Sequence, residues 1–227
     1  MSNKKTTLIV VRHAQSEGNY GRFFAGHTDV CLTELGHRQA KATADFLLPQ
    51  HIDIAYSSDL RRVIQTGKYI ADSHGLNLIL DKGLREIYGG NYEGLSISEI
   101  YKTFQKEREI WDTDFYRAEC PGGESVQELF SRVKPVFDKI AEENIGKTVL
   151  VCTHAAVIRV MSTAFWGKSL ETVSQTPWVD NASATFVEYL GDGRWSMIDF
   201  NHHQQTIENG SYFNIHKTDI TEREKIS

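Results

Sequence analysis

The sequence predicts an α/β fold of three layers, α/β/α, with a mostly parallel sheet and helices on both of its faces. Three observations support this fold class. Short, apolar, β-branched runs alternate with longer segments of helical periodicity. Residues that start and stop helices stand at the boundaries of those segments. The 227 residues, 40% of them hydrophobic, suit a single domain with one core over residues 1–227.

Three apolar runs predict buried strands, and each is followed by side chains suited to phosphate. They are residues 7–11 before Arg12 and His13, residues 54–56 before residues 57–62, and residues 148–152 before Thr153 and His154. Ligands of open α/β sheets bind at the carboxyl ends of the strands. Arginine can hold a phosphoryl group, and histidine can attack it. Nearby guanidinium groups should also disfavour protonation of His13, which leaves a ring nitrogen with its lone pair.

Cap residues give the bounds of the helical segments in order along the chain. Helices are expected from Thr33 to about Leu48, from Leu60 to His74, after the capping box of Ser125 and Glu128, and from Ala155 to Trp166. Gly75 stops the second of these helices. Residues 185–190 and 195–200 predict a hairpin around residues 191–193.

Five groups of residues extend the argument from fold to family. They are Arg12-His13 with Asn19, residues 58–62 with Gln65 and Thr66, residues 84–86 with 92–94, residues 121–125, and residues 152–154 with 157–159. In this order they resemble the histidine phosphatase superfamily, also called phosphoglycerate mutase-like. The resemblance implies that His13 is the nucleophile, that Glu86 is the acid or base, and that Asn19 supports the pocket. The side chains that it implies for the phosphoryl oxygens are Arg12, Arg62 and His154, because Arg61 falls on a variable position of the family.

Four further residues are candidates for lining the substrate pocket: Gln15, Ser16, Arg22 and Ala155. Turn and capping roles explain Gln15 and Ser16 equally well. The family usually has glycine after each of its two histidines, whereas alanine stands at position 14 and at position 155 here. Alanine would be strained there if the backbone needed a positive φ.

An excursion at residues 96–120 is expected to form a helical wall over the phosphate pocket, since family members insert a helical segment there. Its acids outnumber its bases, and it carries five aromatic residues: Tyr101, Phe104, Trp111, Phe115 and Tyr116. Such a wall lacks obvious cations for a second phosphate. Its aromatic rings could pack on an apolar leaving group or simply bury the excursion against the core.

Charge and composition exclude several other classes of protein. The net charge of −5 argues against binding to nucleic acid or to an anionic membrane. No apolar leader or spanning run is present, so a cytoplasmic protein is expected. Three widely spaced cysteines suit reduced thiols, and the remaining histidines form no ligand-like cluster. Neither a metal nor another cofactor is therefore expected, a homodimer is compatible with the sequence, and the polar tail at residues 208–227 should pack loosely.

Three functions remain open. The first is a phosphomonoesterase that hydrolyses a small phosphorylated metabolite through a phosphohistidine on His13. The second is a cofactor-dependent phosphoglycerate mutase with the same core, and the third is a phosphate-binding regulatory module with a dead active site. The intact set of candidate catalytic residues disfavours the third function. The segment after Glu86 lacks the Arg/Lys-rich stretch of authentic mutases, which favours the first.

Overall fold

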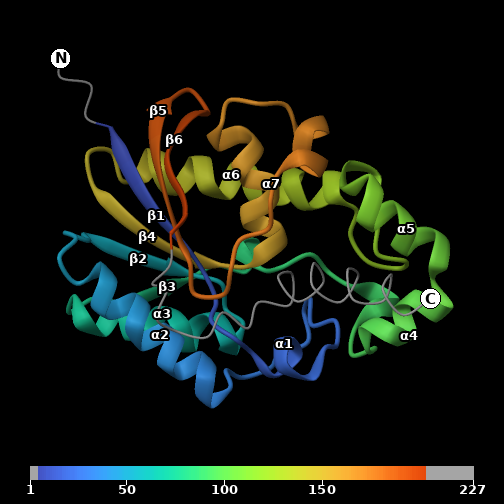
Figure 1. The fold of residues 1–227 in the computed structure, drawn as a ribbon. Coiled ribbons are helices and arrows are strands. Elements are labelled where there is room, and N and C mark those ends of the chain that lie inside the picture. The colour runs from blue at the N-terminus through green and yellow to red at the C-terminus, as the bar shows by residue number, and fades with distance from the viewer. Residues whose placement is uncertain (1–4, 203–227) are drawn as a thin grey trace, which may run out of the picture.

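The computed structural model describes residues 5–202, and a six-stranded sheet forms its middle layer (Figure 1). The strands are β1 (Thr6–Arg12), β2 (Ile54–Ser57), β3 (Leu78–Leu80), β4 (Thr148–Thr153), β5 (Ala184–Gly191) and β6 (Arg194–His202). Their order across the sheet is β3-β2-β4-β1-β5-β6. The strands β1 to β4 run parallel, and β5 is antiparallel to both of its neighbours. The predicted mostly parallel sheet is confirmed, as is the hairpin of β5 and β6.

The central strand β1 is buried on both of its faces. Leu8, Ile9, Val10 and Val11 are at most 1% exposed. Since alternate side chains of a strand point to opposite faces, both faces of β1 are covered. Leu8 and Val10 belong to one hydrophobic cluster, and Ile9 and Val11 belong to another. The predicted core therefore consists of two apolar layers, one on each side of the sheet.

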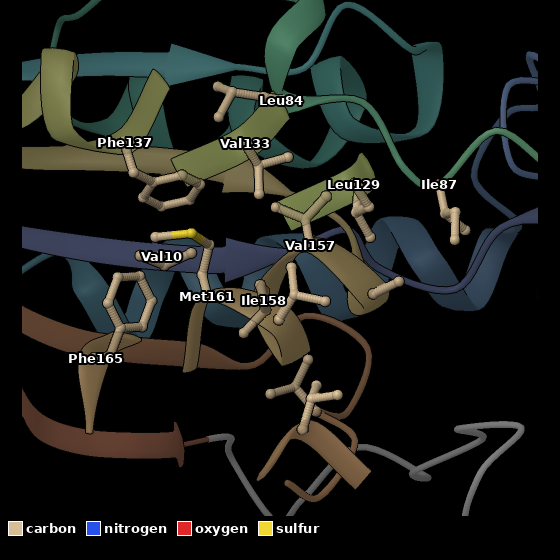
Figure 2. Packing of buried hydrophobic residues seen from close by; sticks show 14 of the residues in the cluster. Val10, Leu84, Ile87, Leu129, Val133, Phe137, Val157, Ile158, Met161 and Phe165 are labelled. Carbon is tan, nitrogen blue, oxygen red and sulfur yellow. The ribbon is translucent and has the colours of Figure 1, made fainter. Parts of the chain in front are cut away.

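Helices cover both faces of the sheet (Figure 1). The helices α2 (Glu34–Leu47) and α3 (Arg61–Ser73) lie on one side with the cluster of Ile9 and Val11. The helices α6 (Val126–Glu143) and α7 (Ala155–Phe165) lie on the other side. Figure 2 shows Phe137 of α6 and Met161 of α7 meeting over Val10 of β1.

The helix bounds agree with the caps found in the sequence. Thr33 accepts a hydrogen bond from the backbone N–H of Gly36, and Ser125 with Glu128 forms a capping box. Gly75 follows α3 with a φ of 67°, a value that favours glycine. The remaining helices are α1 (Glu17–Gly21), α4 (Ile97–Thr103) and α5 (Gln105–Thr113), with 3₁₀ turns at Lys82–Leu84, Gly90–Tyr92, Phe115–Arg117 and Leu170–Gln175. The excursion at residues 96–120 is thus helical, as expected.

The strand register brings the predicted phosphate-binding segments together. Arg12 at the end of β1 pairs with Thr153 at the end of β4, and Ser57 of β2 pairs with Cys152 of β4. Three carboxyl ends therefore meet at one edge of the sheet. No helix between residues 5 and 202 is long and apolar enough to span a bilayer. The tail at residues 208–227, for which loose packing is expected, lies outside the described residues.

Gly36 joins α2 to the loop that follows β1, and its replacement tests this contact. A Cβ atom at position 36 would lie 2.0 Å from the carbonyl oxygen of Gln15. Gly36→Ala is therefore expected to lower the free energy of unfolding by about 1–3 kcal/mol in urea titrations. Glu34→Ala, an exposed change in the same turn, should shift it by less than about 0.5 kcal/mol. Unchanged stability of Gly36→Ala would show that the loop moves away without strain.

Candidate active site

A cavity that is open to solvent lies at the carboxyl end of β1. Eight residues singled out in the sequence line it: Arg12, His13, Ser16, Asn19, Arg22, Arg62, Glu86 and Ala155. Two others, Gln15 and His154, do not line it.

The backbone of His13 is fixed between β4 and the segment before β5. Its N–H donates to the carbonyl of Thr153 at 3.0 Å, and its own carbonyl accepts from the side-chain amide of Asn181 at 3.0 Å. In the ring, Nδ1 lies 2.8 Å from the carbonyl oxygen of Ala14. A carbonyl can only accept, so Nδ1 carries the hydrogen and Nε2 keeps its lone pair.

The surroundings keep the His13 ring neutral. Burial lowers its pKa well below the ordinary 6.5, and the charges of Arg62 and Arg12 lower it further. The guanidinium groups, which are the only cause expected from the sequence, are thus the smaller cause, and burial is the larger one. A neutral ring with a lone pair on Nε2 is the form that can attack phosphorus.

Arg62 is more completely enclosed than Arg12, the other arginine expected to hold phosphoryl oxygens, at 1% exposure. Its guanidinium donates to the carbonyl oxygens of Ala25, Gly26 and Thr28 at 2.8 to 3.0 Å. Burial lowers its pKa to about 10, against the opposing charges of Glu86, Glu93 and Asp29. Its sequence neighbour at position 61 is exposed and pairs with Asp29 outside the cavity, as expected for a surface charge.

Arg12 lies opposite at the end of β1 and is 2% exposed. Its backbone N–H donates to the carbonyl of Ser183, and its Nη1 donates to the carbonyl of Val179 at 2.5 Å. Burial lowers its pKa to about 10, although Glu86 and Asp180 act in the opposite direction. Two buried guanidinium groups thus face one cavity.

His154 lies behind the cavity wall, fully buried, with its ring centroid 5.3 Å from that of His13. Its Nδ1 is 3.3 Å from Nη2 of Arg62, and its Nε2 is 2.9 Å from Oγ of Ser58. Guanidinium only donates, so Nδ1 accepts and Nε2 donates to the hydroxyl. Burial, Arg62 and His13 lower the pKa of His154 well below 6.5. The expected direct contact with phosphoryl oxygens is therefore not preformed, because Arg62 occupies Nδ1.

Glu86 lines the cavity and also caps α7. Its carboxylate accepts hydrogen bonds from the backbone N–H of Ala156 at 3.2 Å and of Ile87 at 3.0 Å. The N-terminus of a helix favours a negative charge. The carboxylate therefore has a fixed direction.

Arg132, which the sequence analysis did not single out, holds the backbone of the loop that ends at Glu86. Its guanidinium donates to the carbonyl oxygens of residues 83, 85 and 86 and forms a two-point ion pair with Glu124. Glu124 accepts in turn from the N–H of Tyr88. Glu124 belongs to the motif at residues 121–125, which was the available signal.

Amide side chains organise the loop after β1. The Oδ1 of Asn19 accepts from the N–H of Ser16 at 3.0 Å and from the Nδ2 of Asn181 at 3.2 Å. Asn181 also binds the carbonyl of His13, and no sequence motif pointed to it. The candidate Gln15 is not among the lining residues, and its Oε1 accepts from the hydroxyl of Thr33 at 2.7 Å, next to the cap of α2.

Alanine fits at both positions where the family usually has glycine. Neither Ala14 nor Ala155 is among the non-glycine residues with positive φ in the described chain. The backbone strain considered from the sequence is therefore not present at either residue.

The outer part of the cavity is apolar. Its wall consists of Phe23, Phe24, Ile87, Ile97, Trp111 and Trp178. Of the five aromatic residues in the excursion only Trp111 lines the cavity, and Phe115 packs in the core at 1% exposure. The excursion does contribute one cation, Arg108, contrary to expectation, but this side chain pairs with Asp112 at 2.6 Å.

Metal-ligating side chains do not gather in the part of the chain that the structure describes. No three His, Cys, Asp or Glu residues between positions 5 and 202 are arranged to hold a metal ion. Within the same residues the cysteines at positions 31, 120 and 152 carry free thiols.

Comparison with known proteins identifies similar phosphatases and phosphoglycerate mutases. The family model of the histidine phosphatase superfamily (branch 1) matches residues 8–203. Phosphoserine phosphatase 1 of Hydrogenobacter thermophilus is 33% identical over 163 residues, 72% of this chain and 77% of that one. A 2,3-bisphosphoglycerate-dependent phosphoglycerate mutase of Mesorhizobium japonicum is 37% identical over 175 residues, 74% and 84% of the two chains. The structure of mycobacterial glucosyl-3-phosphoglycerate phosphatase matches with a TM-score of 0.79 at 28% identity, over 87% of this chain and 99% of that one.

The two buried histidines predict how stability depends on pH. Below about pH 6.5 the unfolded chain takes up protons on His13 and His154, whereas the folded protein does not, since both pKa values are lowered. The free energy of unfolding should therefore fall as the pH drops from 7.5 to 5.5, by at most about 1.4 kcal/mol per pH unit for each ring. Urea titrations of the wild type and of His13→Gln measure this slope. The variant should show the shallower slope, and equal slopes would contradict a neutral His13.

Proposed function

The chain belongs to the histidine phosphatase superfamily, and on that premise we propose that it is a phosphomonoesterase that works through a phosphohistidine on His13. One observation carries the proposal. His13, whose Nε2 keeps its lone pair, lines a cavity that is also lined by two buried guanidinium groups. This arrangement places a nucleophile beside positive charge that suits a phosphate dianion.

The first step transfers the phosphoryl group to the ring. The Nε2 lone pair of His13 forms a bond to phosphorus while the bond from phosphorus to the ester oxygen breaks. Glu86 takes up a proton when the negatively charged phosphate binds beside it, gives that proton to the ester oxygen, and the alcohol leaves. Arg12 and Arg62 stabilise the negative charge on the phosphoryl oxygens. The hydrogen on Nδ1 stays on its bond to the carbonyl of Ala14 throughout.

The second step returns both side chains to their starting states. The carboxylate of Glu86 takes a proton from a water molecule, whose oxygen bonds to phosphorus. The bond from phosphorus to Nε2 breaks, and its electron pair returns to the ring of His13. Inorganic phosphate leaves. Glu86 is positioned for both proton transfers by the N-terminus of α7 and by Arg132.

The cavity favours a monophosphate whose remainder is uncharged or partly apolar. Besides Arg12 and Arg62, the cations among its described lining residues are Arg22 and Arg108. Arg108 is already paired with Asp112, and Arg22 is exposed to solvent, where its charge is screened. A second phosphate would therefore meet little uncompensated positive charge.

A phosphoglycerate mutase is the second candidate, because a relative that bears this name shares 37% identity. A mutase must hold a second acidic group of its substrate and keep water from the phosphoenzyme. The apolar outer wall would exclude water, but it offers few positive charges for the second acidic group. The phosphomonoesterase is therefore the better supported function.

Replacement of the nucleophile tests the proposed intermediate. His13→Ala is expected to abolish release of phosphate and to abolish an acid-labile, base-stable phosphoenzyme, because only the ring can carry the phosphoryl group. Trapping with radiolabelled substrate measures the phosphoenzyme. His51→Ala removes an exposed histidine and should leave both unchanged. Near-normal turnover in His13→Ala would refute this nucleophile.

Replacement of the acid tests its role through the leaving group. Glu86→Gln cannot donate the proton, so kcat/KM for ethyl phosphate should fall by about 10²- to 10⁴-fold. For p-nitrophenyl phosphate the loss should be much smaller, because a nitrophenolate needs little protonation. Glu109→Gln, an exposed change on α5, serves as the control. Equal losses for both substrates would remove Glu86 from the acid role.

Substrate charge separates the two candidate functions. We expect kcat/KM for an alkyl or aryl monophosphate to exceed that for 2,3-bisphosphoglycerate by at least about ten-fold, since the outer wall is apolar. Released phosphate is the measurement. A clear advantage for the bisphosphate, or efficient interconversion of 3- and 2-phosphoglycerate, would assign the mutase instead.

A further inference from the structure

Aromatic rings form a continuous arc along the outer wall of the cavity. The ring of Phe24 lies 5.9 Å from that of Trp111, which lies 4.9 Å from that of Phe115, and Phe115 lies 5.1 Å from Trp178. All three pairs meet edge to face, the geometry that aromatic rings prefer. Phe24, Trp111 and Trp178 line the cavity, while Phe115 lies behind them.

A buried cation supports one end of this arc. Arg159 of α7 is 7% exposed, and its guanidinium carbon lies 4.3 Å from the centroids of both Phe115 and Trp178. Its Nε donates to the carbonyl of Thr176 at 2.8 Å, and its Nη2 donates to the carbonyl of Ser174 at 3.3 Å. No salt bridge joins Arg159 to an acid within the described residues, so ring faces and carbonyl dipoles compensate its charge.

Arg159 does not line the cavity and therefore acts through its neighbours. It connects three segments that are distant in sequence: α7, the turn at Phe115–Arg117, and residues 174–178. Planar guanidinium stacks on both rings at once, a geometry that lysine cannot reproduce. The stack thus fixes the direction of the Trp178 ring toward the cavity.

We propose that the apolar part of the cavity is a subsite for a planar, uncharged leaving group, an aromatic or heteroaromatic ring close to the phosphate ester, with Trp178 as its specificity-determining wall and Arg159 as the residue that positions Trp178. The subsite rests on the proposed phosphomonoesterase function, since the ring enters as part of the ester. It adds a substrate class that the phosphate-binding residues alone do not select.

Three esters of primary alcohols test the subsite with nearly constant leaving-group chemistry: benzyl phosphate, cyclohexylmethyl phosphate and ethyl phosphate. For the wild type, kcat/KM should be highest for benzyl phosphate, lower for the cyclohexylmethyl ester and lowest for ethyl phosphate. The difference in kcat/KM between the benzyl and cyclohexylmethyl esters separates the effect of a planar ring from that of apolar bulk. The benzyl-to-ethyl ratio should be about ten or more, the effect of one well-packed ring.

Variants of Trp178 and Arg159 then test whether these residues cause the preference for the benzyl ester. Trp178→Ala should lower the benzyl-to-ethyl ratio about ten-fold, and Trp178→Phe should restore most of it. Arg159→Met keeps the bulk but removes the charge and the donors, so the ratio should fall about three-fold or more, through KM for the benzyl ester. Trp166→Ala is the matched control, since this tryptophan packs on Phe200 and does not line the cavity. Inhibition by orthovanadate measures the phosphate site separately and should stay within two-fold in each folded variant.

The outcomes separate the subsite from the function. A wild type that hydrolyses all three esters equally, or variants with an unchanged ratio, would overturn the subsite and leave the phosphomonoesterase standing. Release of phosphate from none of the esters, including p-nitrophenyl phosphate, would overturn the proposed function itself. A lower ratio in Trp178→Ala with unchanged vanadate inhibition supports the subsite, even if Arg159→Met fails to fold.

Discussion

The site depends on one electrostatic constraint, the burial of Arg62 without a neutralising carboxylate. Carbonyl oxygens of residues 25, 26 and 28 surround the guanidinium, and no salt bridge joins it to an acid within residues 5–202. A carbonyl carries only a partial negative charge, so the potential at the strand ends stays positive. That potential suits an anion, and together with burial it keeps His13 and His154 neutral.

The backbone around these carbonyl oxygens is held in place by hydrogen bonds to Glu93. Its carboxylate accepts hydrogen bonds from the N–H groups of His27, Thr28 and Gly89. At Gly26 the chain approaches so closely that a Cβ would lie 2.3 Å from the carbonyl oxygen of Ile87. The guanidinium of Arg62 is thus positioned by an acid that does not itself line the cavity.

The features that could be predicted from the sequence are those with a local signal. Strand ends, the cap at Thr33 and the exposed position of Arg61 follow from patterns within a few residues. Which other side chains of the surrounding loops reach the cavity could not be predicted, because this depends on the tertiary fold. Trp178 lines the cavity although it belongs to a segment without a motif. The side chain of Gln15 does not line the cavity and instead accepts a hydrogen bond from Thr33. The roles of the site residues came from family resemblance.

The place of β1 in the sheet has a consequence for biosynthesis. This strand precedes the other strands of the sheet in the chain, yet its two neighbours are β4 and β5, which pair with it through Thr7↔Thr148 and Thr6↔Tyr189. Contacts so distant along the chain slow folding, and the apolar strand lacks both neighbours until β4 and β5 have been translated. A chain that ends before β4 therefore contains His13 but cannot assemble the cavity around it.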